Sequence, residues 1–140
     1  MTVIVCLDDR GGMAFNHRRQ SRDRVVLADM VQTSAGHTLW MSPASARLFT
    51  GWNVPGLRAA EDFLDRAGAE DFCFVEDRPV LPWRARIRGV VLYRWGRVYP
   101  ADLRFDLPLD SGDWALECRT MFAGHSHKTI TKEVYRRCNE

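Results

Sequence analysis

The chain has 140 residues, of which 46% are hydrophobic and 27% are charged, as in a globular protein with one core. The formal net charge of +2 excludes a strong overall attraction to nucleic acid. No apolar run approaches the roughly 20 residues of a membrane-spanning helix, and the start lacks the basic segment of a secretory signal. We therefore expect a single domain over residues 1–140 that resides in the cytoplasm and has no membrane partner.

The first third of the chain alternates strand and helix patterns. Thr2–Leu7 is apolar and β-branched, as in a strand that is buried on both faces. Residues 13–20 show no period and predict a loop. Ser21 is then expected to cap a helix with Asp23 in its first turn, and the helical apolar spacing that follows ends before Gly36.

The middle of the chain continues this alternation. We expect a strand at His37–Met41, a helix through Phe49 with Ser42 as its N-cap, a brief strand at 52–54 and a helix from Pro55 to Ala67. A buried strand at Phe72–Val75, a short helix at Val80–Ile87 and a strand at Gly89–Tyr93 follow.

The two long segments Trp114–Phe122 and Lys128–Arg137 predict a C-terminal antiparallel hairpin. Strands that alternate with helices favour parallel pairing, because the chain must cross over between neighbouring strands. The fold class is therefore expected to be α/β, with three layers, a mainly parallel sheet and an antiparallel edge.

This order of elements, together with several sequence segments, resembles dihydrofolate reductase. VIVCLDDRGGM followed by SRDRVVLADM is similar to the first strand, Gly-Met loop and acid-bearing helix of that family, and HTLWMSPASARLF is similar to its second strand and helix. The segments GVVLYRWG, RFDLPLDSGDWALECRT and GHSHKTITKEVYRR are similar to its last strands and their connections. The resemblance implies a dihydrofolate reductase-like fold.

Departures from the family bear on the cofactor. The family places two glycines, whose backbone approaches the NADPH diphosphate, where this chain has Glu76 and Asp77. The segment from Phe49 to Pro55 is also too short to hold the adenosine half of the cofactor. The catalytic acid of the family aligns with Arg24, or with Asp23 after a shift of one residue. We therefore expect no cofactor and no binding of NADPH.

The arginines around Ser21 are the main candidates for ligand binding. Four of the seven residues from 18 to 24 are arginines, namely Arg18, Arg19, Arg22 and Arg24, and Asn16 and His17 add further donors. A guanidinium group makes bidentate contacts with carboxylate or phosphate, so this segment predicts a site for an anionic small molecule or for RNA phosphates. A solvated basic loop is the alternative.

Three acids are candidates for chemistry or binding. Asp23 is either a general acid whose pKa the arginines lower, or a first-turn helix acid in local ion pairs. Glu76 and Asp77 follow a strand end, where α/β folds bind ligands, and form either a carboxylate pair or a polar turn. His125 and His127 lack a complete ligand set and are expected in a turn, and no metal site is predicted.

The expected function is that of a dihydrofolate reductase-like protein without the NADPH site that binds an anionic ligand through its arginine-rich loop. The alternatives are a divergent enzyme, either a reductase or a phosphodiesterase or ribonuclease, and an RNA-binding regulatory module. The opening also resembles small bacterial chains that carry the name ribonuclease Z. The tRNA-processing enzymes of that name need a His-x-His-x-Asp-His motif, which this chain lacks. Whether the chain is an enzyme, and its oligomeric state, stay open at this point.

Overall fold

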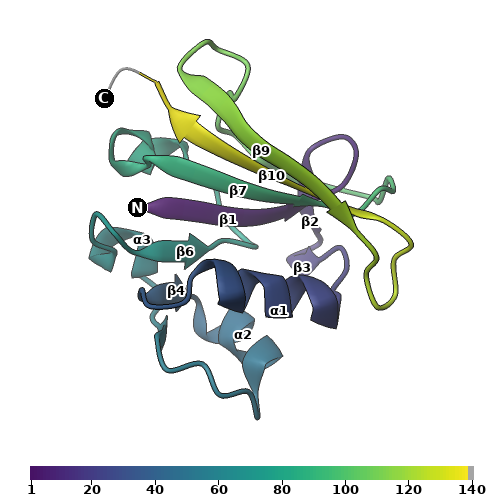
Figure 1. Cartoon of the computed structure of the whole chain (residues 1–140), viewed down its shortest axis with the longest axis horizontal. Helices are drawn as coiled ribbons and strands as arrows, with labels where there is room; N and C mark the ends of the chain where they lie inside the picture. The colour runs from purple at the N-terminus through teal and green to yellow at the C-terminus, as the bar shows by residue number, and fades with distance from the viewer. Residues whose placement is uncertain (139–140) are drawn as a thin grey trace.

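The computed structural model describes residues 1–138, and in this part of the chain seven strands form a sheet in the order β5-β4-β6-β1-β7-β10-β9 (Figure 1). Its parallel part comprises β1 (Thr2–Leu7), β4 (Leu39–Met41), β5 (Leu57–Ala59), β6 (Phe72–Phe74) and β7 (Gly89–Arg94). The antiparallel edge consists of β9 (Trp114–Phe122) and β10 (Ile130–Arg137). The expected α/β fold with a mainly parallel sheet and a C-terminal hairpin is confirmed.

Two hydrophobic clusters cover the two faces of this sheet and define the three layers. On one face, α1 (Arg24–Thr33) and the 3-10 helix η1 (Arg47–Phe49) pack against Ile4 and Tyr93. The other face is covered by α3 (Phe63–Arg66) and by residues beside the 3-10 helix η2 (Leu81–Arg86). Side chains of a strand alternate between its faces, so β1 places its residues in both clusters and is buried on both sides, as its apolar run predicts.

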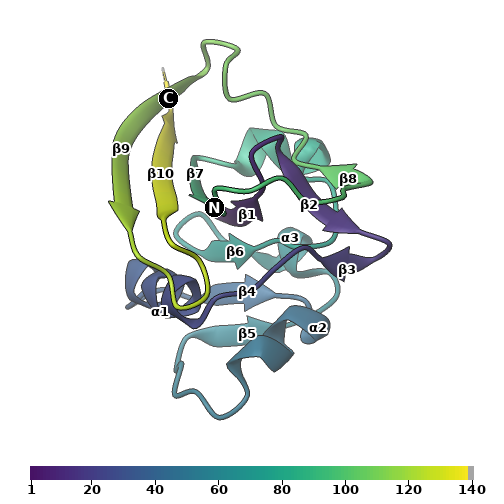
Figure 2. The ribbon, with the colours of Figure 1, turned by 90° about the vertical axis from the view of Figure 1, so that its right-hand side faces the viewer.

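Residues 13–20, expected as a loop, instead form a β-hairpin. β2 (Gly12–Phe15) pairs with β3 (Arg18–Arg19) and with β8 (Leu103–Arg104) in a second, three-stranded sheet (Figure 2). The two residues at the tip, Asn16 and His17, have φ angles of 52° and 62°. A two-residue hairpin turn with positive φ at both central residues usually has glycine at the second of them, and this chain has His17 there.

The helices differ from expectation at two places. Asp23, not Ser21, is the N-cap of α1, and its carboxylate accepts a hydrogen bond from the backbone N–H of Val25. The helix expected from Pro55 to Ala67 is wrong, as is the brief strand at 52–54, because the chain pairs with the open edge of β4 as β5 and forms only the short α3. α2 (Pro43–Ala46), which follows β4 in the chain, begins after Ser42 as expected. Within residues 1–138, no helix is long and apolar enough to cross a membrane.

Candidate functional site

The predicted site residues occupy three separate places. Asn16, His17 and Arg18 lie exposed at the tip of the β2–β3 hairpin. Arg19 turns inward to Glu76, at the carboxyl end of β6. Arg22, Asp23 and Arg24 lie at the start of α1 and face the turn between β9 and β10, which reaches this helix end (Figure 2). The structure therefore does not gather the arginines into one cluster.

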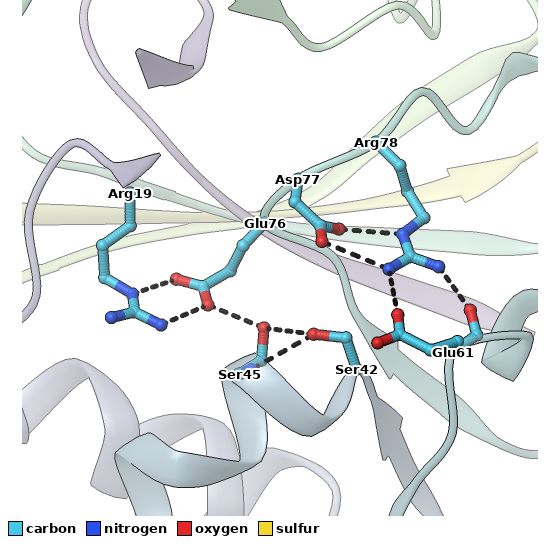
Figure 3. Close-up of polar contacts among 7 residues, drawn as sticks. All are labelled: Arg19, Ser42, Ser45, Glu61, Glu76, Asp77 and Arg78. Atoms are coloured by element: carbon cyan, nitrogen blue, oxygen red, sulfur yellow. Dashed lines mark hydrogen bonds and ion pairs between the residues drawn. The ribbon is translucent and has the colours of Figure 1, made fainter. Parts of the chain in front are cut away.

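Arg19 and Glu76 form a bidentate ion pair that joins the hairpin to the central sheet (Figure 3). The Nε of Arg19 lies 2.8 Å from one carboxylate oxygen of Glu76, and its Nη2 lies 3.0 Å from the other. The Ser45 hydroxyl in α2 donates a further hydrogen bond of 2.7 Å to this carboxylate. Because the Glu76 side chain is only 13% exposed, these partners compensate most of the cost of burying its charge.

Asp77 takes no part in this pair. Its carboxylate lies 2.8 Å from Nε of Arg78, and Arg78 also bonds the backbone carbonyl and the carboxylate of Glu61 (Figure 3). Glu76 and Asp77 therefore point to different cations, and the structure does not hold them as a carboxylate pair. Among residues 1–138, no group of three or more His, Cys, Asp or Glu side chains is placed to hold a metal ion.

Asp23 is a buried anchor for the turn between β9 and β10. Its side chain is 0% exposed, and it accepts hydrogen bonds from the backbone N–H groups of His125 and Ser126 at 2.9 and 2.8 Å. The His127 ring approaches it at 2.9 Å through Nδ1. Gly124 lies so close that a Cβ atom there would be 2.6 Å from the same carboxylate, so this approach requires glycine.

These hydrogen bonds set the ionisation of Asp23. Burial alone would raise its pKa, but the bonds from the backbone of His125, the ring of His127 and the backbone of Ser126 and Val25 outweigh burial and hold the pKa well below its usual range. The expectation that neighbouring arginines lower this pKa therefore names the wrong cause. The carboxylate is ionised at neutral pH and its acceptor positions are occupied by the protein.

The other nitrogen of His127 continues this chain of contacts. Nε2 lies 3.0 Å from the Ser21 hydroxyl and 3.3 Å from the Tyr99 hydroxyl. The ring stacks on Trp95 at a centroid distance of 4.6 Å, which fixes its plane. His127 lies in a turn, as expected, but its contacts extend from α1 to the sheet.

A hollow of about 290 Å³ lies beside this anchor. Its apolar lining is Leu27, Leu48 and Trp52, and its polar lining is Arg22, Asp23, Arg24, His125 and Ser126. Within residues 1–138, neither arginine forms an ion pair with a carboxylate, and Arg24 only approaches the His125 ring at 3.5 Å. The hollow therefore combines an apolar wall with two guanidinium groups for which the described residues supply no ion-pair partner.

A larger hollow of about 660 Å³ lies at the other end of α1 and has a different character. It is lined by Ser34, His37, Val54 and Gly56, among others, and Asp71 is its charged member. That carboxylate already accepts hydrogen bonds from the Trp40 indole and the backbone N–H of Gly68. None of the residues that the sequence singles out for ligand binding lines this larger hollow.

The sequence missed several residues of the region around Asp23. Tyr99 and Trp95 come from the segment after β7, and Leu48 and Trp52 come from η1 and its continuation. No local pattern marks these four as site residues. The His-Ser-His segment and Asp23 are both visible in the sequence, but nothing there shows that they meet across 104 residues.

Comparisons with known proteins bear on the fold. No family model matches the chain, and no curated protein matches it. A solved dihydrofolate reductase from Enterococcus faecalis, in complex with NADP(H) and RAB-propyl, is similar in structure, with a TM-score of 0.69 and 10% sequence identity. The match covers 99% of this chain and 96% of that chain. The chain therefore has a dihydrofolate reductase-like fold, as its sequence segments implied.

Proposed function

We propose that this chain is a dihydrofolate reductase-fold protein that binds an anionic small molecule without NADPH. The observation that carries the proposal is the hollow at the start of α1, where Arg22 and Arg24 meet the apolar side chains of Leu27, Leu48 and Trp52. The solved reductase of similar structure carries NADP(H), so the fit of that cofactor is considered first.

The residues present do not fit the cofactor. In the dihydrofolate reductase family that this chain resembles, the cofactor diphosphate lies against two glycines that follow the strand corresponding to β6. In this chain, Glu76 follows β6 instead. The Glu76 carboxylate already accepts hydrogen bonds from the guanidinium of Arg19 and the hydroxyl of Ser45, and both of these donors could otherwise bind a phosphate. A diphosphate would have to displace a mostly buried anion from these partners and then lie beside its charge.

The hollow at the start of α1 is positively charged, whereas the cofactor position carries the negative charge of Glu76. Asp23 contributes one negative charge, but its carboxylate is buried and its hydrogen bonds are made within the protein, whereas Arg22 and Arg24 are exposed. The two guanidinium groups therefore leave the hollow with a net positive charge. A volume of about 290 Å³ is at the lower end of the range for ligand pockets. The chemistry favours a small ligand with one ring and one carboxylate or phosphate, the ring on Leu27 and Trp52 and the anion on the arginines.

A titration with 4-aminobenzoate, followed by the amide signals of the isotope-labelled protein, tests this proposal. We expect saturable shifts at Arg22, Arg24 and Leu27, and much weaker shifts with the neutral 4-aminobenzamide. The double substitution of Arg22→Gln and Arg24→Gln should weaken binding roughly tenfold or more, because each charge-assisted contact contributes about 1.5 kcal/mol or more.

The matched control is Arg84→Gln with Arg104→Gln, because both side chains are exposed and lie outside the hollow. This variant should bind the carboxylate like the wild-type protein. If both double variants bound the carboxylate equally weakly, the lower net charge of the protein alone would explain the loss of affinity. Equal affinity for the carboxylate and the amide would contradict the proposed role of the arginines.

RNA binding is the second candidate, and one observation favours it. The tip of the β2–β3 hairpin carries Phe15, which is 48% exposed, opposite Arg18 in the strand register and two positions before His17. An exposed aromatic ring beside cations is the usual means of binding single strands, whereas Trp40 is only 8% exposed and lies under Arg58. Salt-dependent binding of single-stranded RNA that Phe15→Ala weakens would support it. No binding at low salt would count against it.

A further inference from the structure

Three side chains at the start of α1 form a connected row that the binding proposal does not use. The Asp23 carboxylate lies 2.9 Å from Nδ1 of His127, and Nε2 of His127 lies 3.0 Å from the hydroxyl oxygen of Ser21. The row runs from the buried carboxylate of Asp23 through the ring of His127 to Ser21, a residue that is partly exposed. A serine, a histidine and an acid connected in this order are the elements of an activated serine nucleophile.

The acid end of the row has the properties that this chemistry needs. The Asp23 carboxylate accepts hydrogen bonds from the backbone N–H groups of His125 and Ser126, which keep it ionised and fixed in place. An ionised acid at Nδ1 places the ring proton on that nitrogen and leaves the lone pair of Nε2 free to accept a proton. Of the two hydroxyl groups beside Nε2, that of Ser21 is the nearer, at 3.0 Å against 3.3 Å for Tyr99. The stack on Trp95 keeps the ring in the plane that joins both partners.

The hydroxyl end differs from a structural latch in one respect. A hydroxyl that only tied α1 to the turn would be expected inside the protein. Asp23 already makes that connection through three residues of the turn, His125, Ser126 and His127. Ser21 lies before the first residue of the helix, and the residue is partly exposed.

The geometry points to Ser21 as a nucleophile for acyl transfer, with His127 as its general base and Asp23 as the residue that positions His127, acting on carboxylic esters. In the first half-reaction the Ser21 oxygen bonds the ester carbonyl carbon, and its proton passes to Nε2 of His127. The tetrahedral oxyanion collapses, the bond to the alkoxide breaks, and the alkoxide leaves as an alcohol with the proton from His127. Water then attacks the acyl-serine in the same way, which releases the carboxylic acid and restores Ser21.

Positive charge around Ser21 suits the oxyanion that forms in both half-reactions. Arg22 follows Ser21 directly in the chain, and Arg24 is exposed at the start of α1. Cations near a developing oxyanion lower the barrier most where they are already in place. The nucleophile does not depend on the proposed ligand hollow, because neither Ser21 nor His127 lines it.

A fluorophosphonate probe, which phosphonylates activated serine hydroxyls, tests the inference on the full chain by intact-mass spectrometry. We expect one adduct on the wild-type protein and none on Ser21→Ala. Ser111→Ala is the matched control, because Ser111 lies exposed in the loop before β9, and it should keep the adduct. A wild-type protein that the probe does not modify, or a Ser21→Ala variant that it still modifies, would overturn the inference.

Hydrolysis of 4-nitrophenyl acetate gives a second readout. His127→Gln should lower the rate of nitrophenol release by about 100-fold or more, which is the usual contribution of a general base. His37→Gln, at an exposed histidine far from Ser21 in the fold, should leave the rate unchanged. Equal rates in all three proteins would overturn the role of His127. The fluorophosphonate reacts at Ser21, whereas 4-aminobenzoate is proposed to bind at Arg22 and Arg24. Failure of labelling and failure of carboxylate binding can therefore be told apart.

Discussion

The buried carboxylate of Asp23 gives the sharpest prediction about stability. Asp23→Asn keeps the size of the side chain and one oxygen, so the N-cap contact with Val25 can persist, since Asn caps helices as well as Asp. The amide NH₂ group then faces the donors that Oδ2 now accepts from, the backbone N–H of Ser126 and Nδ1 of His127. Asp23→Ala removes the cap as well.

The magnitude follows from these contacts. Each hydrogen bond to a charged group contributes about 1.5–3 kcal/mol, and neighbouring bonds add less than their sum. We expect Asp23→Asn to lower the free energy of unfolding by about 3 kcal/mol, and Asp23→Ala by roughly 1 kcal/mol more through the lost cap. A loss of this size should lower Tm by about 10 °C in a chain of this length.

Urea unfolding at several pH values measures the effect. The folded-state pKa of Asp23 is depressed, so its stabilisation is complete above the unfolded-state pKa of about 4 and is lost as the pH falls below that value. The difference in unfolding free energy between the wild-type protein and Asp23→Asn should therefore be full at pH 7 and shrink below about pH 4.

Asp9→Asn is the matched control, because Asp9 is exposed and neighbours the first strand. It should change the free energy of unfolding by no more than about 0.5 kcal/mol. The description of Asp23 as the anchor of the β9–β10 turn is refuted if Asp23→Asn is as mild as this control. It is also refuted if the difference from wild type stays constant down to pH 2.

Three further predictions concern other contacts. Arg19→Ala should cost about 1–2 kcal/mol because it leaves the mostly buried Glu76 without its cation, and a double-mutant cycle with Glu76→Gln should show coupling; additive losses would contradict the ion pair. Gly124→Ala should cost about 1–3 kcal/mol in urea unfolding, because its Cβ would meet the Asp23 carboxylate at 2.6 Å, and a neutral result would mean that the turn can move. Burial raises the pKa of Cys73 to about 12, so Ellman's reagent should modify the exposed Cys118 in the native protein and Cys73 only in denaturant; early reaction of Cys73 would contradict its burial.

The parts of the fold that were predicted from the sequence carry local signals. Thr2–Leu7 is apolar at every position but the first, as is typical of a strand that is buried on both faces, and it forms β1. The alternation in Lys128–Arg137 likewise matches β10. A helix was expected where β5 lies, because the three residues of β5 carry no local strand pattern and form a strand by pairing with the edge of β4. The hairpin at residues 13–20 was missed because Asn16 and His17 adopt positive φ without a glycine.

The candidate site was predicted less well, because its contacts are distant in the sequence. Arg19 and Glu76 were both singled out, for separate reasons, and they lie 57 residues apart in the chain. Asp23 was expected to be either a general acid or a first-turn acid in local ion pairs, whereas its partners outside α1 come from the turn after β9. A charge pattern shows which residues are present, but only the topology of the sheet shows which of them meet.

We propose that Glu76 and Arg19 occupy the position that the cofactor diphosphate takes in dihydrofolate reductase, and that this chain does not bind NADPH. A fluorescence titration of the wild-type protein with NADPH tests it most directly, with the Enterococcus faecalis reductase as the positive control. We predict no saturable binding of NADPH by this chain under conditions in which the control saturates. Saturable binding at micromolar NADPH would contradict the claim.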